Sequence, residues 1–456
     1  MADLEQTAMT PQQIEDLLTA FTNVLNQEQP LDLSKPEDAR RYVTGLHGGT
    51  DAVARLGRDI LRRIGEGVFL FTGQPGSGKS TELMRLKRDL SARGAKVYYC
   101  DLQDWLNLNA PVSLSSFLVA LLSSWVDQVG AIQGQRSPAE RLLAFFSSTR
   151  LIPEGVKFDA GFGAVKSQFQ LALQTDENFR RELEANLQRQ KSSFLGQARD
   201  FVAELQADLC PNGERCVVLA DSLEKIRGYG DASTLVYESV RRLFVAEGAA
   251  LRLPGVHVVY SVSPFLAEQD TQIAAALGTG IVVNMPSVHV LHQRSRDPDE
   301  TGLAAMQALV AARFPRWAEV FTAQQLRRFA IDTGGDLRDF LRAIRVALSD
   351  DINALPAPDA AVDFALEHVS PSRAIPAEHV RWLAQVDERH DAELAGDIDA
   401  DVLQRYLATK HVLAYLNGST WYALHPMVRG WVQARAARLA AEAAAARPPA
   451  TAAGTG

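Results

Sequence analysis

Two hydrophobic patterns alternate along the middle of this chain of 456 residues. Short unbroken apolar runs predict buried strands at residues 68–71, 96–100, 216–220, 256–262 and 280–285. Apolar residues spaced three and four positions apart predict helices at residues 51–64, 83–90, 114–125 and 236–244. Strands that alternate with helices in this way are typical of an α/β domain built on a parallel sheet.

The alternation is interrupted between residues 150 and 209. The pattern loosens from Leu151 to Thr175, where several glycines stand, and predicts a loop or hairpin. An apolar stripe then predicts one long helix from Asp176 to Leu209, or a helical pair broken near Ser192-Ser193. We interpret this part as an insertion to which its pattern assigns no function.

Helical patterns also dominate both ends of the chain. Residues 10–26 carry an amphipathic stripe, which predicts a helix that packs on the next domain or docks a partner. Residues 302–348 are helical in pattern, and residues 360–440 predict helices followed by a hairpin around Asn417-Gly418, the arrangement of a winged helix. The expected divisions are an N-terminal helix and linker (1–37), a core (38–292), a helical lid (293–358), a winged helix (359–440) and a disordered tail (441–456).

Composition places the chain among globular proteins with a large core, since 46% of its residues are hydrophobic and 22% are charged. The formal net charge of −8 argues against binding nucleic acid or an anionic membrane through bulk electrostatics. The three cysteines form no Cys-x-x-Cys motif, which indicates a reducing compartment. The first residues lack the features of a signal peptide, and no apolar run has the length of a membrane span. We therefore expect a cytoplasmic protein without a membrane partner.

The strongest chemical signal lies directly after the first predicted strand. Residues 73–80, Gly-Gln-Pro-Gly-Ser-Gly-Lys-Ser, fit the phosphate-loop pattern G-x-x-x-x-G-K-[ST] without a mismatch. Glycines let the backbone N–H groups of such a loop curl toward phosphate oxygens, and the following helix adds the positive end of its dipole. Lys79, expected on a surface loop, would reach the β- and γ-phosphates of ATP or ADP, and Ser80 would bind Mg²⁺. Thr81 would hydrogen-bond locally. The residues expected to bind nucleotide here are Gly73, Gln74, Pro75, Gly76, Ser77, Gly78, Lys79, Ser80 and Thr81.

Carboxylates at the ends of two later strands complete the candidate site. Asp221 follows the strand at residues 216–220, and we expect it to hold the Mg²⁺ shell together with Ser80. Glu224 lies three residues further on and is our first candidate for the group that polarises the attacking water. Asp101, at the end of the second strand, is the alternative for that role. With Lys79, Asp221 and Glu224 form the expected catalytic set.

Several other residues are candidates for contacts with the nucleotide. A small polar residue at the end of the fourth strand often faces the γ-phosphate or the attacking water, which selects Ser261 or Ser263, and we place Ser263 in the site. Tyr42 and Val43, upstream of the first strand, are candidates for contact with the adenine base, with simple packing as the alternative. Arg338 follows a double-glycine turn and would deliver its guanidinium to a phosphate, unless it is only a surface residue.

Taken in order, these motifs resemble the STAND branch of the AAA+ ATPases, which includes NLR-like and NACHT-like signalling ATPases. The resemblance covers residues 38–435, from the phosphate loop through Asp221-Ser-Leu-Glu224 to the winged helix. It implies a three-layer P-loop fold of the AAA+/ASCE type with a helical lid and a C-terminal winged helix. It also implies that His425, in Leu424-His425-Pro426 after the second wing strand, contacts a nucleotide phosphate in the resting state, with packing between wing and helix as the alternative.

Two departures from that family bear on function. The second acidic residue stands three positions after Asp221, whereas family members often carry it one or two positions after the aspartate. The family usually fuses an effector domain at one end and repeats at the other, and this sequence shows neither. A switch of this kind would therefore signal to a separate effector or sensor protein.

Three functions are consistent with these patterns. The first is a slowly hydrolysing regulatory ATPase that switches a separate effector through nucleotide-dependent conformation or homo-oligomeric assembly, and the resemblance adds a role in bacterial antiphage defence. The second is an initiator- or loader-like ATPase that acts on DNA through its winged helix. The third is a nucleotide-bound scaffold without turnover.

The charge of the winged helix weighs against the second of these functions. Its candidate recognition helix, at residues 401–410, contains only Arg405 and Lys410 as basic residues. We therefore expect no strong binding to nucleic acid. Whether Arg241 or Arg242 acts in trans as an arginine finger is left open by the sequence.

Overall fold

The computed structural model describes residues 9–25, 29–47, 51–129, 137–149, 161–228, 232–264, 266, 273, 276–278, 282–285, 287–394, 398, 400–417 and 419–445. The chain divides into two compact units. The sheet unit consists of residues 30–39 and 50–285, and the helical unit consists of residues 1–29, 40–49 and 286–456. A short helix, α2 (Pro36–Arg41), occupies the end of the predicted linker and crosses from one unit to the other.

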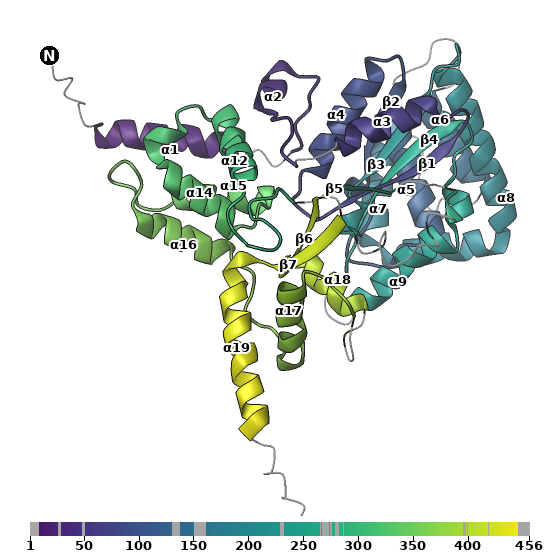
Figure 1. Ribbon diagram of the computed structural model, residues 1–456. Helices are drawn as coiled ribbons and strands as arrows, with labels where there is room; N and C mark the ends of the chain where they lie inside the picture. The colour runs from purple at the N-terminus through teal and green to yellow at the C-terminus, as the bar shows by residue number, and fades with distance from the viewer. Residues whose placement is uncertain are drawn as a thin grey trace, which may run out of the picture. The chain divides into compact units, whose positions relative to one another are not determined.

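Five parallel strands form the sheet unit's centre: β1 (Gly67–Gly73), β2 (Lys96–Asp101), β3 (Cys216–Asp221), β4 (Val256–Val262) and β5 (Val282–Met285). Their order is β2-β3-β4-β1-β5, so that β1 lies inside the sheet and β2 lies at an edge (Figure 1). The register pairs Asp101 with Asp221 and Gly73 with Met285. Because all neighbouring strands are parallel, their carboxyl ends share one edge, where the predicted site residues stand.

Helices cover both faces of this sheet, because alternate strand positions point to opposite sides. On one face, α3 (Ala52–Arg62) and α4 (Lys79–Ser91) bury their apolar stripes against β1, β2, β3, β4 and β5. On the other, α5 (Leu114–Asp127) and α9 (Ala232–Val245) bring Trp125, Phe117 and Phe244 against aromatic strand residues. Three short 3₁₀ turns follow or precede strands: η1 (Leu102–Asp104), η2 (Leu223–Lys225) and η3 (Gly248–Leu251). The predicted three-layer α/β fold is confirmed.

The insertion is helical over its described residues. It contains α7 (Gly161–Thr175) and α8 (Glu177–Leu209), and α6 (Pro138–Ser148) precedes it. The predicted loop or hairpin is wrong for α7, where Phe169 and Leu173 are buried. Its glycines lie in the first turn, so they weaken the helical signal without interrupting the buried face. The long helix α8 is confirmed, with a kink at Gln190, two residues before the predicted break.

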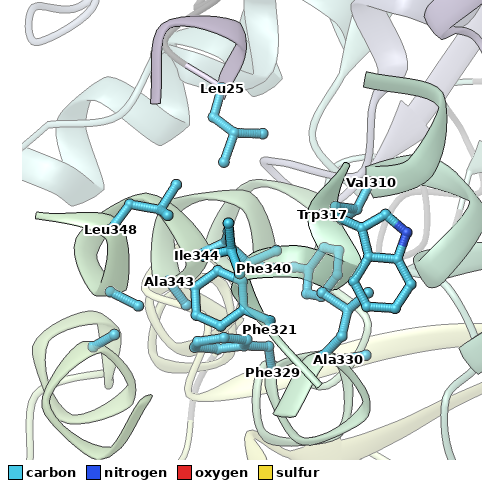
Figure 2. Packing of buried hydrophobic residues seen from close by; sticks show 14 of the residues in the cluster. Leu25, Val310, Trp317, Phe321, Phe329, Ala330, Phe340, Ala343, Ile344 and Leu348 are labelled. Carbon is cyan, nitrogen blue, oxygen red and sulfur yellow. The ribbon is translucent and has the colours of Figure 1, made fainter. Parts of the chain in front are cut away.

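The helical unit has its own hydrophobic core. It is built from α1 (Pro11–Leu25), α12 (Glu300–Arg313), α13 (Trp317–Val320), α14 (Ala323–Asp332), α15 (Leu337–Leu348) and α16 (Asp359–Val369). Figure 2 shows part of this core, where Phe321, Phe329 and Phe340 gather. The ring of Phe21 stacks on Phe314 with 4.3 Å between the ring centroids. The predicted N-terminal helix is confirmed, and its apolar stripe packs into this core.

The predicted winged helix follows. It contains α17 (Ala377–Arg389), α18 (Ala400–Ala408), the hairpin of β6 (Val412–Asn417) and β7 (Ser419–Leu424), and α19 (Pro426–Ala445). The hairpin register places Tyr415 opposite Trp421, and their rings stack at 4.4 Å between centroids. Helix α19 begins at Pro426 and continues to Ala445, beyond residue 440, where the winged-helix domain was expected to end.

A buried ion cluster ties α15 to the wing. The Lys410 ammonium, in the turn before β6, donates hydrogen bonds to Asp336 Oδ1 and Asp339 Oδ2, both at 2.8 Å. The Lys410 side chain is 12% exposed, and those of Asp336 and Asp339 are 0% and 11% exposed. Burial raises the pKa of the Asp339 carboxyl, and the neighbouring Asp336 adds to that effect. Lys410 has φ 60°, a left-handed conformation that these two contacts stabilise.

The double glycine before α15 allows close contact with the hairpin. Gly334 and Gly335 have φ values of 63° and 76°. A Cβ on Gly334 would collide with Leu413, and one on Gly335 would collide with the carbonyl oxygen of Val288. The Tyr415 hydroxyl donates a hydrogen bond to the Gly334 carbonyl oxygen at 2.7 Å. Lid and wing are therefore one packed body within the helical unit.

The ion cluster predicts a stability effect. Replacing Lys410 by methionine keeps the length of the chain but leaves Asp336 and Asp339 without their cation, which should lower the free energy of unfolding by roughly 3 kcal/mol. Urea denaturation followed by far-UV circular dichroism measures this change. Arg373→Met removes a partner from the exposed Arg373–Glu367 pair and serves as the control, with an expected effect below about 0.5 kcal/mol. Equal effects of the two substitutions would show that the cluster contributes no more than a surface pair.

Candidate functional site

The backbone of residues 73–80 forms the expected phosphate loop. Strand β1 ends at Gly73, where a Cβ would collide with the carbonyl oxygen of Met285 on β5, so the sheet itself requires glycine there. Gly76 and Gly78 have φ values of 95° and 93°, which bend the loop into helix α4. The glycine spacing of the motif is thus explained by one close interstrand approach and two left-handed residues.

Lys79 is not on the surface, contrary to expectation. Its residue is 3% exposed, and its ammonium donates to the carbonyl oxygens of Gly73 at 2.8 Å and Gln74 at 3.0 Å. Glu224 Oε1 lies 3.3 Å from the same ammonium. The loop therefore curls around its own lysine, because a buried cation needs carbonyl and carboxylate oxygens in place of water.

Glu224 is held at the centre of a chain of contacts that links three strands. It stands in η2, directly after β3, and Ser222 before it has a left-handed φ of 72° that turns the chain. Ser261 of β4 donates from its hydroxyl to Glu224 Oε2 at 2.9 Å. The two carboxylate oxygens thus contact Lys79 and Ser261, which places Glu224 beside the phosphate loop, where its predicted role requires it.

The two serine candidates on β4 differ in their surroundings. Ser261 is fully buried and bonded to Glu224. Ser263 lies after the strand, and its hydroxyl accepts a hydrogen bond from the Leu266 amide at 3.3 Å. The contact of Ser263 with a phosphate stays a prediction, whereas Ser261 is the serine that the structure joins to the other site residues.

Asp101 and Asp221 end neighbouring strands and lie opposite each other in the register. Asp101 accepts from the amide N–H of Gln103 at 3.2 Å and from its side-chain amide at 2.7 Å. Burial raises the pKa of the Asp101 carboxyl. Since Asp101 is occupied by Gln103, whose own side-chain oxygen accepts from Lys225 at 2.7 Å, Glu224 is the carboxylate in direct contact with the phosphate-loop lysine.

A tyrosine that sequence reasoning missed completes the site. Asp221 Oδ1 accepts from the Ser222 amide at 2.8 Å, and Asp221 Oδ2 accepts from the Tyr99 hydroxyl at 2.6 Å. The side chain of Ser80 interacts with the same hydroxyl. Burial raises the pKa of Tyr99, and the charge of Asp221 raises it further. Its position two residues before Asp101, on the same side of β2, was the available signal, but apolar packing explained that residue equally well.

The residues present fit a magnesium-bound nucleotide. Asp221 accepts from the Tyr99 hydroxyl, and Ser80 lies near enough to the same hydroxyl to influence its pKa. The hydroxyl and carboxylate oxygens of Ser80 and Asp221 are ligands that Mg²⁺ prefers. Ser77 Oγ and Thr72 Oγ1 are buried without a hydrogen-bond partner among the described residues. Thr81 Oγ1 accepts from the Leu31 amide at 3.4 Å, so its partner is distant in sequence rather than local as expected.

Four predicted site residues belong to the helical unit. Val43 packs against that unit's core, and Tyr42 adjoins it in sequence, so their contact with adenine stays a prediction. Arg338 is exposed in the first turn of α15. Arg241, one of the two arginines left open, belongs to the sheet unit and lies 3.7 Å from Glu238 on α9.

His425 is fully buried, with its imidazole between the wing and α19. Burial lowers its pKa to about 3, so the ring is neutral at pH 7. The Met427 amide donates to Nδ1 at 3.4 Å, which leaves the hydrogen on Nε2. Nε2 has no hydrogen-bond partner among the described residues. The contact of His425 with a phosphate stays a prediction.

Comparison with protein-family models and with curated proteins finds no match. Solved structures are similar in fold at low identity. The ORC2 protein of Aeropyrum pernix in its ADP form has 13% identity and a TM-score of 0.43, over 92% of this chain and 98% of that chain. The Walker-type ATPase paby2304 of Pyrococcus abyssi has 13% identity and a TM-score of 0.43, over 90% and 99%. The Aeropyrum pernix ORC1 protein in complex with DNA has 11% identity and a TM-score of 0.37, over 93% and 98%.

The class of this protein follows from its own topology. A phosphate loop follows β1, a strand with a terminal aspartate lies two positions away in the sheet, and β4 lies between them. With the helical lid and winged helix, these features define a P-loop nucleotide-binding fold of the AAA+ type. Among the described helices, none combines the length and the apolarity that crossing a bilayer requires.

The geometry predicts that Lys79→Ala weakens binding of Mg·ATP by at least about a hundredfold, because the substitution removes the cation that meets the phosphates. Titration with a fluorescent ATP analogue measures the dissociation constant. The variant should also unfold at a lower temperature, since Glu224 loses its buried partner. Lys96→Ala, at the exposed start of β2, is the matched control. Wild-type affinity in a folded Lys79→Ala variant would mean that nucleotide binds elsewhere.

Proposed function

We propose that this protein is an ATP-binding, slowly hydrolysing ATPase that acts as a nucleotide-dependent conformational switch. The observation that carries the proposal is the chain of contacts from the loop carbonyls through Lys79 and Glu224 to Ser261. It joins the phosphate-binding lysine to a carboxylate suited to activate water. A phosphate that drew Lys79 away from Glu224 would change the contacts of Glu224 at the end of β3 and with β4.

The side chains would act in a defined order. Lys79 would leave the carbonyl oxygens of Gly73 and Gln74 to meet the phosphates, which offer it stronger charge-assisted bonds. Glu224, released from Lys79, would orient and polarise the attacking water. Ser261 would keep Glu224 in place by its hydrogen bond.

Ser80 and Asp221 would hold Mg²⁺, which when bound neutralises charge on the phosphate oxygens. Asp221 is fixed for this by the Ser222 amide. Asp101 would remain bonded to Gln103 and serve to order η1. In the helical unit, Arg338 is exposed and able to meet a phosphate, and His425 Nε2 is a donor able to do so after a rearrangement.

The target of the switch is proposed on the resemblance to STAND ATPases. The protein would act on a separate effector or sensor through a nucleotide-dependent change in conformation or homo-oligomerisation, in a role such as antiphage defence. The buried ion cluster between lid and wing supports a switch in which the two move together. If they separated, Lys410, Asp336 and Asp339 would lose their partners.

A second candidate function is action on DNA. One of the similar solved structures, the ORC1 protein of Aeropyrum pernix, is described in complex with DNA. In the initiator- or loader-like function that the sequence left as an alternative, the winged helix would contact the DNA. The charges of α19 speak against a free basic face, since Arg429 donates to Asp387 at 2.6 Å and Arg435 stacks on Trp431.

Turnover separates the switch from a nucleotide-bound scaffold. Glu224→Gln should retain nucleotide binding and lower the rate of phosphate release by about a hundredfold or more, because the amide cannot act as a base. Asp101→Asn is the matched control and should keep most of the activity. The reverse result, with activity retained in Glu224→Gln and lost in Asp101→Asn, would identify Asp101 as the carboxylate that polarises the attacking water. The absence of phosphate release from wild type would favour the scaffold.

Measuring DNA binding distinguishes action on a separate effector protein from action on DNA. At a salt concentration of about 0.15 M, duplex DNA should bind more weakly than micromolar, because phosphate neutralisation requires more basic side chains than the winged helix offers. Fluorescence anisotropy with labelled duplex, in the presence of ADP and of ATP, measures this. Sub-micromolar affinity that falls in an Arg405→Ala variant would favour action on DNA as the function, since Arg405 is exposed on the candidate recognition helix.

A further inference from the structure

The magnesium position in this site is taken by a side chain of the protein itself. Asp221 accepts two hydrogen bonds, from the Ser222 amide on Oδ1 and from the Tyr99 hydroxyl on Oδ2. The bond to Tyr99 is short, 2.6 Å, and joins neighbouring strands β2 and β3. Ser80, the other expected Mg²⁺ ligand, meets the same hydroxyl from the start of α4. The Tyr99 hydroxyl therefore bonds one of the two residues that Mg²⁺ would join and lies near the other.

A cation bound between Asp221 and Ser80 would compete with the Tyr99 hydroxyl for space and for lone pairs. Mg²⁺ holds its ligand oxygens at about 2.0–2.1 Å in a near-ideal octahedron, so a point between Ser80 and Asp221 has room for one occupant. The Tyr99 hydroxyl points its hydrogen at Asp221, and the same hydrogen would point at the cation. A cation that takes the side of Oδ2 that faces Tyr99 would displace this hydrogen bond.

Tyr99 stands on the edge strand of the sheet, where it packs against the core and is partly exposed. Strand β2 lies at the edge of the sheet, with β3 as its one strand neighbour, and Tyr99 is only partly buried. Its neighbour Tyr98 points to the opposite face, where its ring lies 6.0 Å from that of Trp125. The two consecutive tyrosines thus have the same side chain on the same strand, but only Tyr99 contacts a residue of the candidate site.

We propose that Tyr99 is a positioning residue that competes with Mg²⁺ for Asp221 and Ser80, so that it selects against magnesium-bound nucleotide in the resting site. This inference rests on the proposed function, because it assumes that nucleotide binds at the phosphate loop. Tyr99 holds Asp221 and Ser80 together without a metal. Loading of Mg·ADP or Mg·ATP has to displace its hydroxyl, whereas ADP without metal leaves the hydrogen bond intact.

The test compares ADP binding with and without magnesium. Dissociation constants are measured by calorimetry for wild type, Tyr99→Phe and Tyr98→Phe, each with ADP in excess MgCl₂ and with ADP in excess EDTA. Tyr99→Phe keeps the ring and removes the hydroxyl, so it should lower the dissociation constant for Mg·ADP by about tenfold, the loss of one competing hydrogen bond to a charged group. The dissociation constant in EDTA should stay the same. Tyr98→Phe should change neither value.

A double-mutant comparison gives a second readout. In an Asp221→Asn background the carboxylate for which Tyr99 competes is gone. Adding Tyr99→Phe should then leave unchanged the ratio of the dissociation constant of ADP in MgCl₂ to that in EDTA. Thermal denaturation by circular dichroism checks that each variant is folded. An effect of Tyr99→Phe that persists in that background would overturn the competition.

The outcomes separate this inference from the proposed function. Binding of ADP with an unchanged magnesium ratio in Tyr99→Phe would reject the role of Tyr99 and keep the nucleotide site. Weaker Mg·ADP binding in Tyr99→Phe would show that the hydroxyl orients Asp221 for the metal, the opposite of competition. Failure of wild type to bind ADP under either condition would reject both proposals.

Discussion

A buried ammonium group organises the candidate site. Lys79 is surrounded by the carbonyl oxygens of its own loop and by Glu224, and this replaces the water that the charge would otherwise require. Glu224 is in turn fixed by Ser261. The end of β1, the turn after β3 and the end of β4 are therefore held together by one charge. Any group that offers Lys79 a better partner changes the environment of all three.

The edge of the sheet adds a second constraint next to the first. Tyr99 and Asp221 connect β2 to β3 beside the same loop, through a hydroxyl that also meets Ser80. Lys79 thus pairs with the Glu224 carboxylate, and Tyr99 donates a hydrogen bond to the Asp221 carboxylate. Nucleotide chemistry would depend on these two carboxylates. Both carboxylates therefore have partners within the protein, and binding of nucleotide and metal would exchange these contacts for new ones.

The helical unit also contains a buried ammonium group that is paired with carboxylates. Lys410 is buried against Asp336 and Asp339, and Gly334 and Gly335 provide the close approach that this contact needs. A double glycine before a helix with an arginine indicated phosphate contact at the sequence level. In the structure its demonstrable role is packing, since a side chain at either position would collide with the wing or with Val288. Arg338 is exposed beside it.

The sequence by itself determined the strands, the phosphate loop and the aspartate after β3, because unbroken apolar runs and left-handed glycines have few alternative explanations. It also predicted α1 and the Asn417-Gly418 hairpin. It failed on α7, where glycines in the first turn hid a helix whose face is buried only by its neighbours. Only the tertiary structure decided that Lys79 is buried, that Ser261 rather than Ser263 meets Glu224, and that Tyr99 reaches Asp221. These contacts join residues up to 145 positions apart, as Lys79 and Glu224 are, and no local pattern encodes which strands lie side by side.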